Sequence, residues 1–310
     1  MPKNILIYAH IPDGFSFIDG GTVAQYNLAR QLDELGCNVR LHHCTGVKIE
    51  NTIFNKFYNN DFPIDNNAVV IYCEGTQGNP LNARYAVRWL LSELGQNVPR
   101  DWINGWGKDE LVYYFNSERK FYDAPEKLGV EYKLLNSLYI NPNVKQKNYG
   151  ERTGVCYTIR KAHLVHKHGI NSLHFYDSYE ITRDHTQEQC IEFFNSFKWF
   201  ISYDSLTFLT VIAALCGCIS VVYKINGLTK QDWIKTTAAA EYCKSKGLDN
   251  LYGIAYGVDD ILNAFSTIHL AKEQWEDILK FNKENTIVPF INDIENFENA
   301  LNTIQNNYYS

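Results

Sequence analysis

The first part of the chain alternates between apolar strands and amphipathic helices. Residues 4–10 (NILIYAH) form an apolar run with the length of a buried strand. In the next segment the apolar positions recur close to helical spacing, at Val23, Tyr26, Leu28, Ala29 and Leu32. This predicts a helix over 22–35, ended by Gly36, and a second strand at 38–42. A strand, a helix and a strand in this order predict a parallel sheet.

The same alternation continues to the end of the chain. Further strands are predicted at 68–73, 110–115, 132–138, 154–159, 173–176 and 252–255. Further helices are predicted at 83–94, 162–168, 186–196, 258–268, 272–283 and 293–306. Segment 139–152 is polar, contains Pro and Gly and lacks an apolar period, so we expect a linker there. We therefore predict an α/β fold with two Rossmann-like, doubly wound domains, 1–145 and 146–290, that face each other across a cleft. A C-terminal helix in 291–310 is expected to pack back on the first domain.

The longest apolar stretch, Phe200–Val222, divides into three elements. FISY is a strand, FLTVIAALC is a buried helix that Gly217 ends, and CISVVY is a second strand. Between the first strand and the helix lies a polar corner, Asp204-Ser205-Leu206-Thr207, made of residue types that cap helices. Asp204 and the Ser, Thr and Gly interruptions argue against a transmembrane span, which needs about 20 mainly apolar residues.

Candidate ligand-binding residues fall at the carboxyl ends of the predicted strands of the second domain. Arg160 and Lys161 directly follow strand 154–159, and the corner that carries Asp204, Ser205 and Thr207 follows strand 200–203. Open α/β sheets bind ligands at this edge, and free N–H groups at a helix start favour anions. Two adjacent cations there suit a diphosphate. The alternative is that Arg160 and Lys161 are surface basic residues at a strand end.

Two loops of the first domain carry candidate acids. Asp13 lies in the loop that leads to Gly20-Gly21, a pair that would let a ligand approach the start of the helix closely. Glu74 directly follows strand 68–73, and Gly75 comes after it. Either acid could deprotonate an acceptor hydroxyl as a general base. The commoner role of Asp in such turns is to cap the loop, which leaves Glu74 as the stronger candidate.

Composition narrows the class of partner. A net charge of -6 argues against nucleic acid or an anionic membrane as the main partner, although it allows a local basic pocket. The start MPKNILIYAH has no signal-peptide pattern, and eight dispersed cysteines are typical of free buried thiols, so we expect a cytoplasmic protein. Walker A and GxGxxG sequences are absent, and no set of residues has the spacing of a metal site.

The layout resembles the Leloir glycosyltransferases of the GT-B fold. The stretches that carry the resemblance are GG…LARQLDELGCNVRLH, GNPLNARYAVRWLL, FISYDSLT…AALCGCISVV and GIAYGVDDI. The resemblance implies an acceptor site on the first domain, a nucleotide-sugar donor site on the second, and a diphosphate held by Arg160 and Lys161. Many retaining members have a glutamate about five residues before the helix-ending glycine. Ile212 stands there in this chain, so that role is missing or has moved to Asp204, and the stereochemistry stays open.

We therefore expect a metal-independent glycosyltransferase without a bound cofactor. It would move a hexose or deoxyhexose from a UDP- or GDP-linked sugar to a hydroxyl on a glycan or glycoconjugate. Two alternatives remain at this stage. One is a nucleotide-sugar epimerase-like enzyme, and the other is a cytosolic two-lobed protein that binds a nucleotide or sugar without catalysis.

Overall fold

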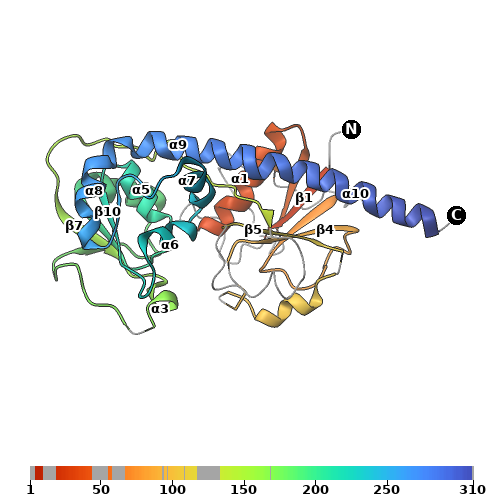
Figure 1. The fold of residues 1–310 in the computed structure, drawn as a ribbon, viewed down its shortest axis with the longest axis horizontal. Helices are drawn as coiled ribbons and strands as arrows, with labels where there is room; N and C mark the ends of the chain where they lie inside the picture. The colour runs from red at the N-terminus through yellow and green to blue at the C-terminus, as the bar shows by residue number, and fades with distance from the viewer. Residues whose placement is uncertain are drawn as a thin grey trace. The chain divides into compact units, whose positions relative to one another are not determined.

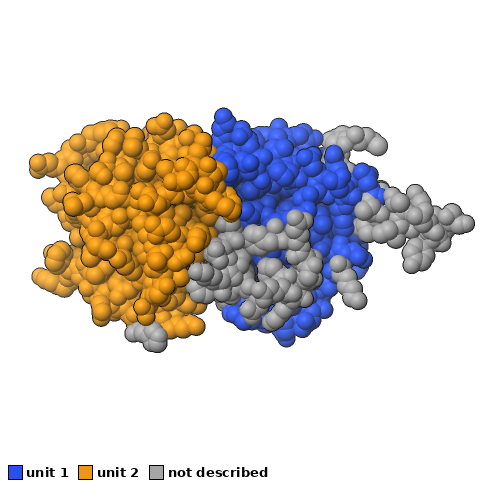
Figure 2. All heavy atoms as spheres, viewed as in Figure 1, with its two compact units in different colours: residues 1–15, 21–138, 280–310 blue, residues 16–20, 139–279 orange. Residues whose placement is uncertain are grey.

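The chain folds into two compact units (Figure 2), and each unit contains one β-sheet. The computed structural model describes residues 4–9, 19–43, 55–57, 67–92, 94–95, 97–107, 109–116, 133–167 and 169–308. Unit 1 comprises residues 1–15, 21–138 and 280–310, and unit 2 comprises residues 16–20 and 139–279. The divisions at 139 and 280 compare with predicted domain limits at 145 and 290.

Unit 1 contains a six-stranded sheet with the order β2-β1-β3-β4-β5-β6, in which every neighbouring pair is parallel (Figure 1). Its strands are β1 (Asn4–Ala9), β2 (Asn38–His43), β3 (Val69–Cys73), β4 (Tyr85–Leu90), β5 (Leu111–Tyr114) and β6 (Lys133–Leu134). The long helix α1 (Gly20–Glu34) connects β1 to β2, and η1 (Asn55–Phe57) and η2 (Arg100–Gly105) are short 3₁₀ helices. The predicted parallel α/β sheet is therefore confirmed in this unit.

The predicted helix at 83–94 is wrong, because this segment contains strand β4. All six residues of β4 are buried, as expected for a central strand of a parallel sheet, which is covered on both faces. A mainly apolar run of this length fits a buried helix as well as a buried strand, and only the structure separates them. The single charged residue of the strand, Arg88, is completely buried.

Arg88 is buried because the groups around it satisfy its guanidinium. Its Nε and Nη2 donate to the two carboxylate oxygens of Glu110 at 2.6 and 2.9 Å. Nη2 also donates to the carbonyl of Gly78 at 2.7 Å, which holds the connection between β3 and β4. The rings of Tyr72 and Trp106 lie 4.8 and 5.2 Å from the guanidinium carbon. The connection between β3 and β4 thus packs on an ion pair, whereas the connection between β1 and β2 contains helix α1.

The end of the chain belongs to unit 1. Helix α9 (Ala271–Asn282) continues through a π-helical turn (Lys283–Ile287) into α10 (Val288–Tyr308). The carboxylate of Asp293 in α10 accepts a 2.6 Å hydrogen bond from the Tyr113 hydroxyl and pairs with Lys133 at 3.0 Å.

The π-helical turn is attached to the segment that leaves β6. Asn282 donates to the side chain of Asn136 at 3.0 Å, and the Thr286 hydroxyl accepts from the Asn136 N–H at 3.0 Å. Asn136 lies just before the chain enters unit 2 at 139, and Asn282 lies just after it has returned at 280. The two ends of the long segment of unit 2, 139–279, are therefore both tied to one asparagine.

Unit 2 contains a five-stranded parallel sheet with the order β11-β10-β9-β7-β8 (Figure 1). Its strands are β7 (Thr153–Thr158), β8 (Tyr179–Glu180), β9 (Phe197–Ser202), β10 (Ile219–Val222) and β11 (Ile254–Tyr256). Its helices are α3 (Ala162–Val165), α4 (Gln187–Ser196), α5 (Leu209–Leu215), α6 (Lys230–Lys235), α7 (Ala240–Lys246), η3 (Val258–Asp260), α8 (Ile261–Thr267) and η4 (Ile268–Leu270), followed by α9.

The predicted strand–helix–strand at 200–222 is confirmed, and Gly217 follows α5 with φ +79°. In the described part of the chain, no helix has the length and apolar character needed to cross a membrane.

The predicted strand at 173–176 is wrong, since the second strand of this sheet is β8 at Tyr179–Glu180. Residues 173–174 are held as a loop over the sheet. The backbone N–H of Leu173 donates to the Tyr203 hydroxyl at 2.6 Å, and the ring of His174 stacks on Tyr157 with centroids 3.6 Å apart. These side-chain contacts replace ladder hydrogen bonds. The sequence does not predict helices α6 and α7. Each has only six or seven residues, too few for apolar positions to repeat at helical spacing.

We predict that the Arg88–Glu110 pair is essential to the stability of unit 1. Arg88→Leu leaves the Glu110 carboxylate without its cation, and we expect the free energy of unfolding to fall by about 3–5 kcal/mol in urea titrations. The matched control is Arg88→Leu combined with Glu110→Leu, which removes both charges and should lose clearly less stability than the single variant. A double variant that is as unstable as the single one would contradict this account.

Candidate functional site

The candidate site lies where the connections of the second sheet change direction. In chain order the strands of unit 2 are arranged 2-1-3-4-5, so β7 and β9 are neighbours while β8 lies on the far side of β7. The connections that leave β7 and β9 therefore run in opposite directions, and ligands of open α/β sheets bind in the crevice between such loops. The N–H of Tyr203 after β9 donates to Thr158, the last residue of β7, at 3.0 Å. Residues that follow these two strands are thus held side by side, as the sequence predicts for Arg160, Lys161 and the Asp204 corner.

Arg160 is the least ordinary residue of this crevice. Its φ of +35° lies in the left-handed region that side-chain-bearing residues rarely adopt. Its Nε is buried and has no hydrogen-bond partner among the described residues. Burial lowers the pKa of the guanidinium, Asp204 and Asp19 oppose this shift, and the positive charge of Arg183 adds to it. A strained cation with an unsatisfied buried donor is a feature of sites that bind anions.

Asp204 joins the loops that follow β7 and β9. Its carboxylate accepts from the N–H of Leu206 at 3.3 Å and from the N–H of Lys161. Burial raises the pKa of Asp204, while these hydrogen bonds and the charges of Lys161 and Arg160 oppose that shift. The carboxylate thus helps to hold the chain that follows Arg160, with the side chain of Lys161 exposed.

Ser205 and Thr207 are bound within the corner. The Ser205 hydroxyl donates inward to the carbonyl of Tyr223 at 2.9 Å, and its carbonyl accepts from Trp233 Nε1 at 2.8 Å. The Thr207 hydroxyl accepts from the N–H of Leu209, the first residue of the short helix α5, at 3.4 Å. Thr207 is half-buried, whereas Ser205 is buried.

His166 and Ser205 lie close together but do not form a nucleophile–base pair. His166 Nε2 lies 3.3 Å from the Ser205 hydroxyl and 3.0 Å from the carbonyl of Tyr203. A carbonyl only accepts, so Nε2 carries the proton and is not free to take one from serine. Burial lowers the pKa of His166, against the opposing effects of the Tyr203 carbonyl and Asp204. His166 therefore connects the segment after β7 to the end of β9 and has no place in a hydrolytic dyad.

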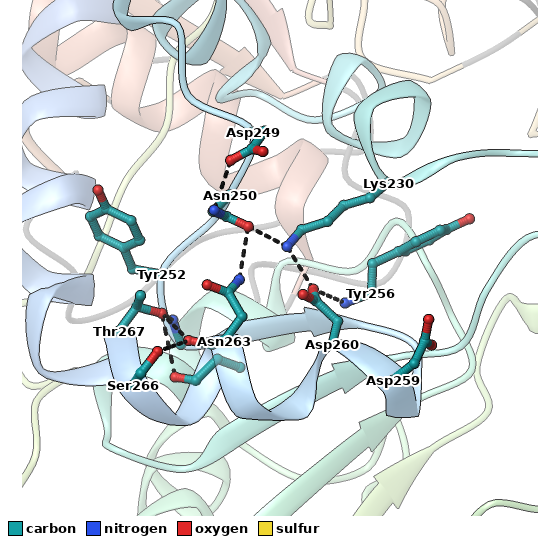
Figure 3. Close-up of polar contacts among 12 residues, drawn as sticks. Lys230, Asp249, Asn250, Tyr252, Tyr256, Asp259, Asp260, Asn263, Ser266 and Thr267 are labelled. Carbon is teal, nitrogen blue, oxygen red and sulfur yellow. Dashed lines mark hydrogen bonds and ion pairs between the residues drawn. The ribbon is translucent and has the colours of Figure 1, made fainter.

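A polar network closes the other end of the same sheet (Figure 3). Asp260 accepts from the N–H of Tyr256 in β11 at 2.9 Å and pairs with Lys230 at 2.7 Å. Asn250 accepts from both Lys230 and Asn263. Because β11 is the last strand of the sheet, this network covers backbone that would otherwise be open to pairing with another chain.

The carboxylates of this network form ion pairs and hydrogen bonds with neighbouring residues. Asp259, next to Asp260, pairs with Lys224 at 2.8 Å. The described residues contain no group of three or more His, Cys, Asp or Glu side chains that could hold a metal ion. The network therefore stabilises the sheet and leaves the crevice between β7 and β9 as the candidate site.

The candidate residues that follow β1 and β3 are only partly placed. Gly20 and Gly21 form the first turn of α1, after β1 of the other sheet, and no atom stands within 4 Å of a Cβ added at Gly20. Asp13 lies outside the described residues. Glu74 follows β3 as predicted, but it is only 7% exposed, and its oxygens accept from the N–H of Leu91 at 2.9 Å and the hydroxyl of Ser92 at 2.6 Å. Burial raises the pKa of Glu74, and these hydrogen bonds oppose the shift.

Arg183 is a charged residue of this edge that the sequence did not reveal. The strand expected at 173–176 would have placed position 183 far from any strand end. With β8 at Tyr179–Glu180, Arg183 instead follows the strand next to β7. Strand β8 is only two exposed residues long, within the polar stretch DSYEITRDH, so the sequence carries no clear signal for it.

Comparison with known proteins assigns no family. No protein-family model matches the chain, and no curated protein matches its sequence. Functional inference for this chain therefore depends on the arrangement of its own residues.

We predict that His166 makes unit 2 less stable in mild acid. Because its pKa in the folded chain lies below the ordinary 6.5, the unfolded chain binds more protons as the pH falls through that value, and stability decreases. His166→Gln lacks this group. The difference in unfolding free energy between wild type and His166→Gln should therefore shrink from about pH 7.5 to about pH 5.5 in denaturant titrations. A constant difference over this range would show that His166 does not titrate differently in the two states.

Proposed function

We propose that unit 2 binds a nucleoside-diphosphate sugar in the crevice between β7 and β9, and that the protein is a glycosyltransferase. One observation carries this proposal: Arg160 is held at the switch point of the sheet in a strained conformation, with a buried donor that lacks a partner. Lys161 supplies a second cation at the same strand end, and Thr207 lies across from it after β9. Cations and N–H groups arranged in this way suit a diphosphate.

In the proposed reaction, the bond between the anomeric carbon of the sugar and the diphosphate oxygen breaks. The electron pair of that bond stays on the diphosphate, where Arg160 and Lys161 stabilise the negative charge that develops. An acceptor hydroxyl on a glycan or glycoconjugate forms the new bond to the sugar and loses its proton. Asp204 would act indirectly, because its carboxylate is bound by the N–H groups of Leu206 and Lys161.

We propose Glu74 as the base that takes the proton of the acceptor if the reaction inverts the anomeric centre. Its raised pKa makes the Glu74 carboxylate a stronger base than an ordinary glutamate, which suits a general base. The hydroxyl of Ser92 now donates to one oxygen, and this side chain would have to rotate away for the acceptor to reach the carboxylate. If the anomeric configuration is retained, Glu74 would position the acceptor instead.

The donor site is tested by calorimetry with UDP, GDP and ADP and the matching nucleotide sugars. Since Arg160 has φ +35°, Arg160→Gly removes the side chain without the backbone strain that alanine would keep. We expect Arg160→Gly and Lys161→Ala each to weaken nucleotide binding by about 1.5–3 kcal/mol, the contribution of a charge-assisted hydrogen bond. Unchanged nucleotide affinity in both variants would remove the assignment.

The role of Glu74 is tested by sugar transfer to a hydroxyl acceptor. Glu74→Gln keeps the size of the side chain, and its amide oxygen can still accept from Leu91 or Ser92, but it does not act as a base. We expect turnover to fall at least about a hundredfold while donor affinity stays unchanged. Near-normal turnover in this variant would exclude Glu74 as the base and leave the donor site intact.

A further inference from the structure

Arg183 lies one strand away from Arg160 at the same edge of the sheet. The N–H of Ile181 donates to the Tyr157 carbonyl at 2.7 Å, and the Thr158 hydroxyl donates to the Ile181 carbonyl at 2.8 Å. These bonds hold Thr158 next to Ile181. Arg160 and Arg183 each follow two residues later, on loops that leave adjacent parallel strands in the same direction.

The turn that carries Arg183 is held in place by its neighbours. The N–H of Thr182 donates to His185 Nδ1 at 3.1 Å, and the N–H of Asp184 donates to the Thr182 hydroxyl at 3.4 Å. On its other side the His185 ring lies 3.0 Å from the Tyr179 hydroxyl. The guanidinium of Arg183 itself is exposed, and within the described chain it makes no hydrogen bond or ion pair. The described contacts therefore leave the Arg183 guanidinium available to bind a ligand.

The cations at this edge repel one another. The charge of Arg183 contributes to the lowered pKa of Arg160, and Lys161 adds a third positive charge at the end of β7. Nearby acids partly offset them: Asp204 is occupied by two N–H groups, Asp19 opposes the lowered pKa of Arg160, and Asp184 follows Arg183 in an exposed turn. Like charges held together in this way are stabilised by a bound anion.

We propose that Arg183 is a third cation of the anion site and binds the second phosphate of a ligand whose two linked phosphates lie across the ends of β7 and β8. The inference rests on the proposed nucleotide site and adds two things to it. It names a binding residue on the turn that follows β8, and it makes the site selective for a diphosphate over a monophosphate. Arginine suits this role because its planar fork donates two hydrogen bonds to one phosphate group.

The test compares probes that differ by one phosphate. Inorganic pyrophosphate with orthophosphate, UDP with UMP and GDP with GMP are titrated calorimetrically into the full chain. We expect Arg183→Ala to weaken the binding of the diphosphate probes about tenfold and the binding of the monophosphates little. The ratio of diphosphate affinity to monophosphate affinity should therefore fall. Arg183→Lys should recover part of the ratio, because it keeps the charge and loses the fork. Lys246→Ala, an exposed cation at the end of α7 just before β11, is the matched control and should change nothing.

The outcomes separate this inference from the proposed function. If Arg160→Gly loses nucleotide binding and Arg183→Ala keeps the full preference for diphosphates, the site stands and the role of Arg183 is excluded. If Arg183→Ala weakens the binding of monophosphates and diphosphates equally, Arg183 does not bind the second phosphate. If the wild-type chain binds none of the probes, the nucleotide site itself is excluded.

Discussion

The strongest constraint on this structure is that both sheets are entirely parallel. Parallel pairing sends the carboxyl end of every strand to the same edge, so each sheet collects the loops that follow its strands along one side. It also requires cover on both faces, which is why β3, β4 and β10 are buried along their whole length. The polar residues of unit 2 that can meet a ligand are therefore concentrated at one edge. Most of the polar side chains that lie inside the sheets, such as Arg88, must be matched by a partner.

The sequence predicts this architecture well where the apolar pattern is long. The strand–turn–helix–strand around Asp204 was predicted from its residues alone, and with it the pairing of that corner with Arg160 and Lys161. The errors occur where tertiary contacts override the local pattern. Segment 83–94 has the composition of a buried helix, and it becomes a strand because Glu110 allows Arg88 to enter the sheet. Residues 173–174 are β-prone and become a loop because Tyr157 and Tyr203 hold them, and for that reason Arg183 could not be foreseen.

Asp204 and Glu74 are two carboxylates at strand ends that have different surroundings. Asp204 and Glu74 are both buried, both have a raised pKa and both accept from backbone N–H groups. Asp204 has cations beside it, so its charge supports the turn that presents them. Glu74 receives hydrogen bonds only from neutral groups, Leu91 and Ser92, among its described contacts. Position at a strand end is visible in the sequence, but the surroundings that decide the chemistry of a carboxylate are set by residues that are distant along the chain.

The return of the chain through Asn282 and Thr286 has a consequence for synthesis on the ribosome. Apart from residues 16–20, unit 2 is one continuous segment that ends at 279, so its sheet can be completed before the last part of the chain has been made. Unit 1 also contains strands β1 to β6, yet the bonds of Tyr113, Lys133 and Asn136 to α10 and the π-helical turn form only when residues 280–308 emerge. Unit 1 therefore begins before unit 2 along the chain and is completed after it, and until residues 280–308 are available its sheet lacks the helix that covers Tyr113.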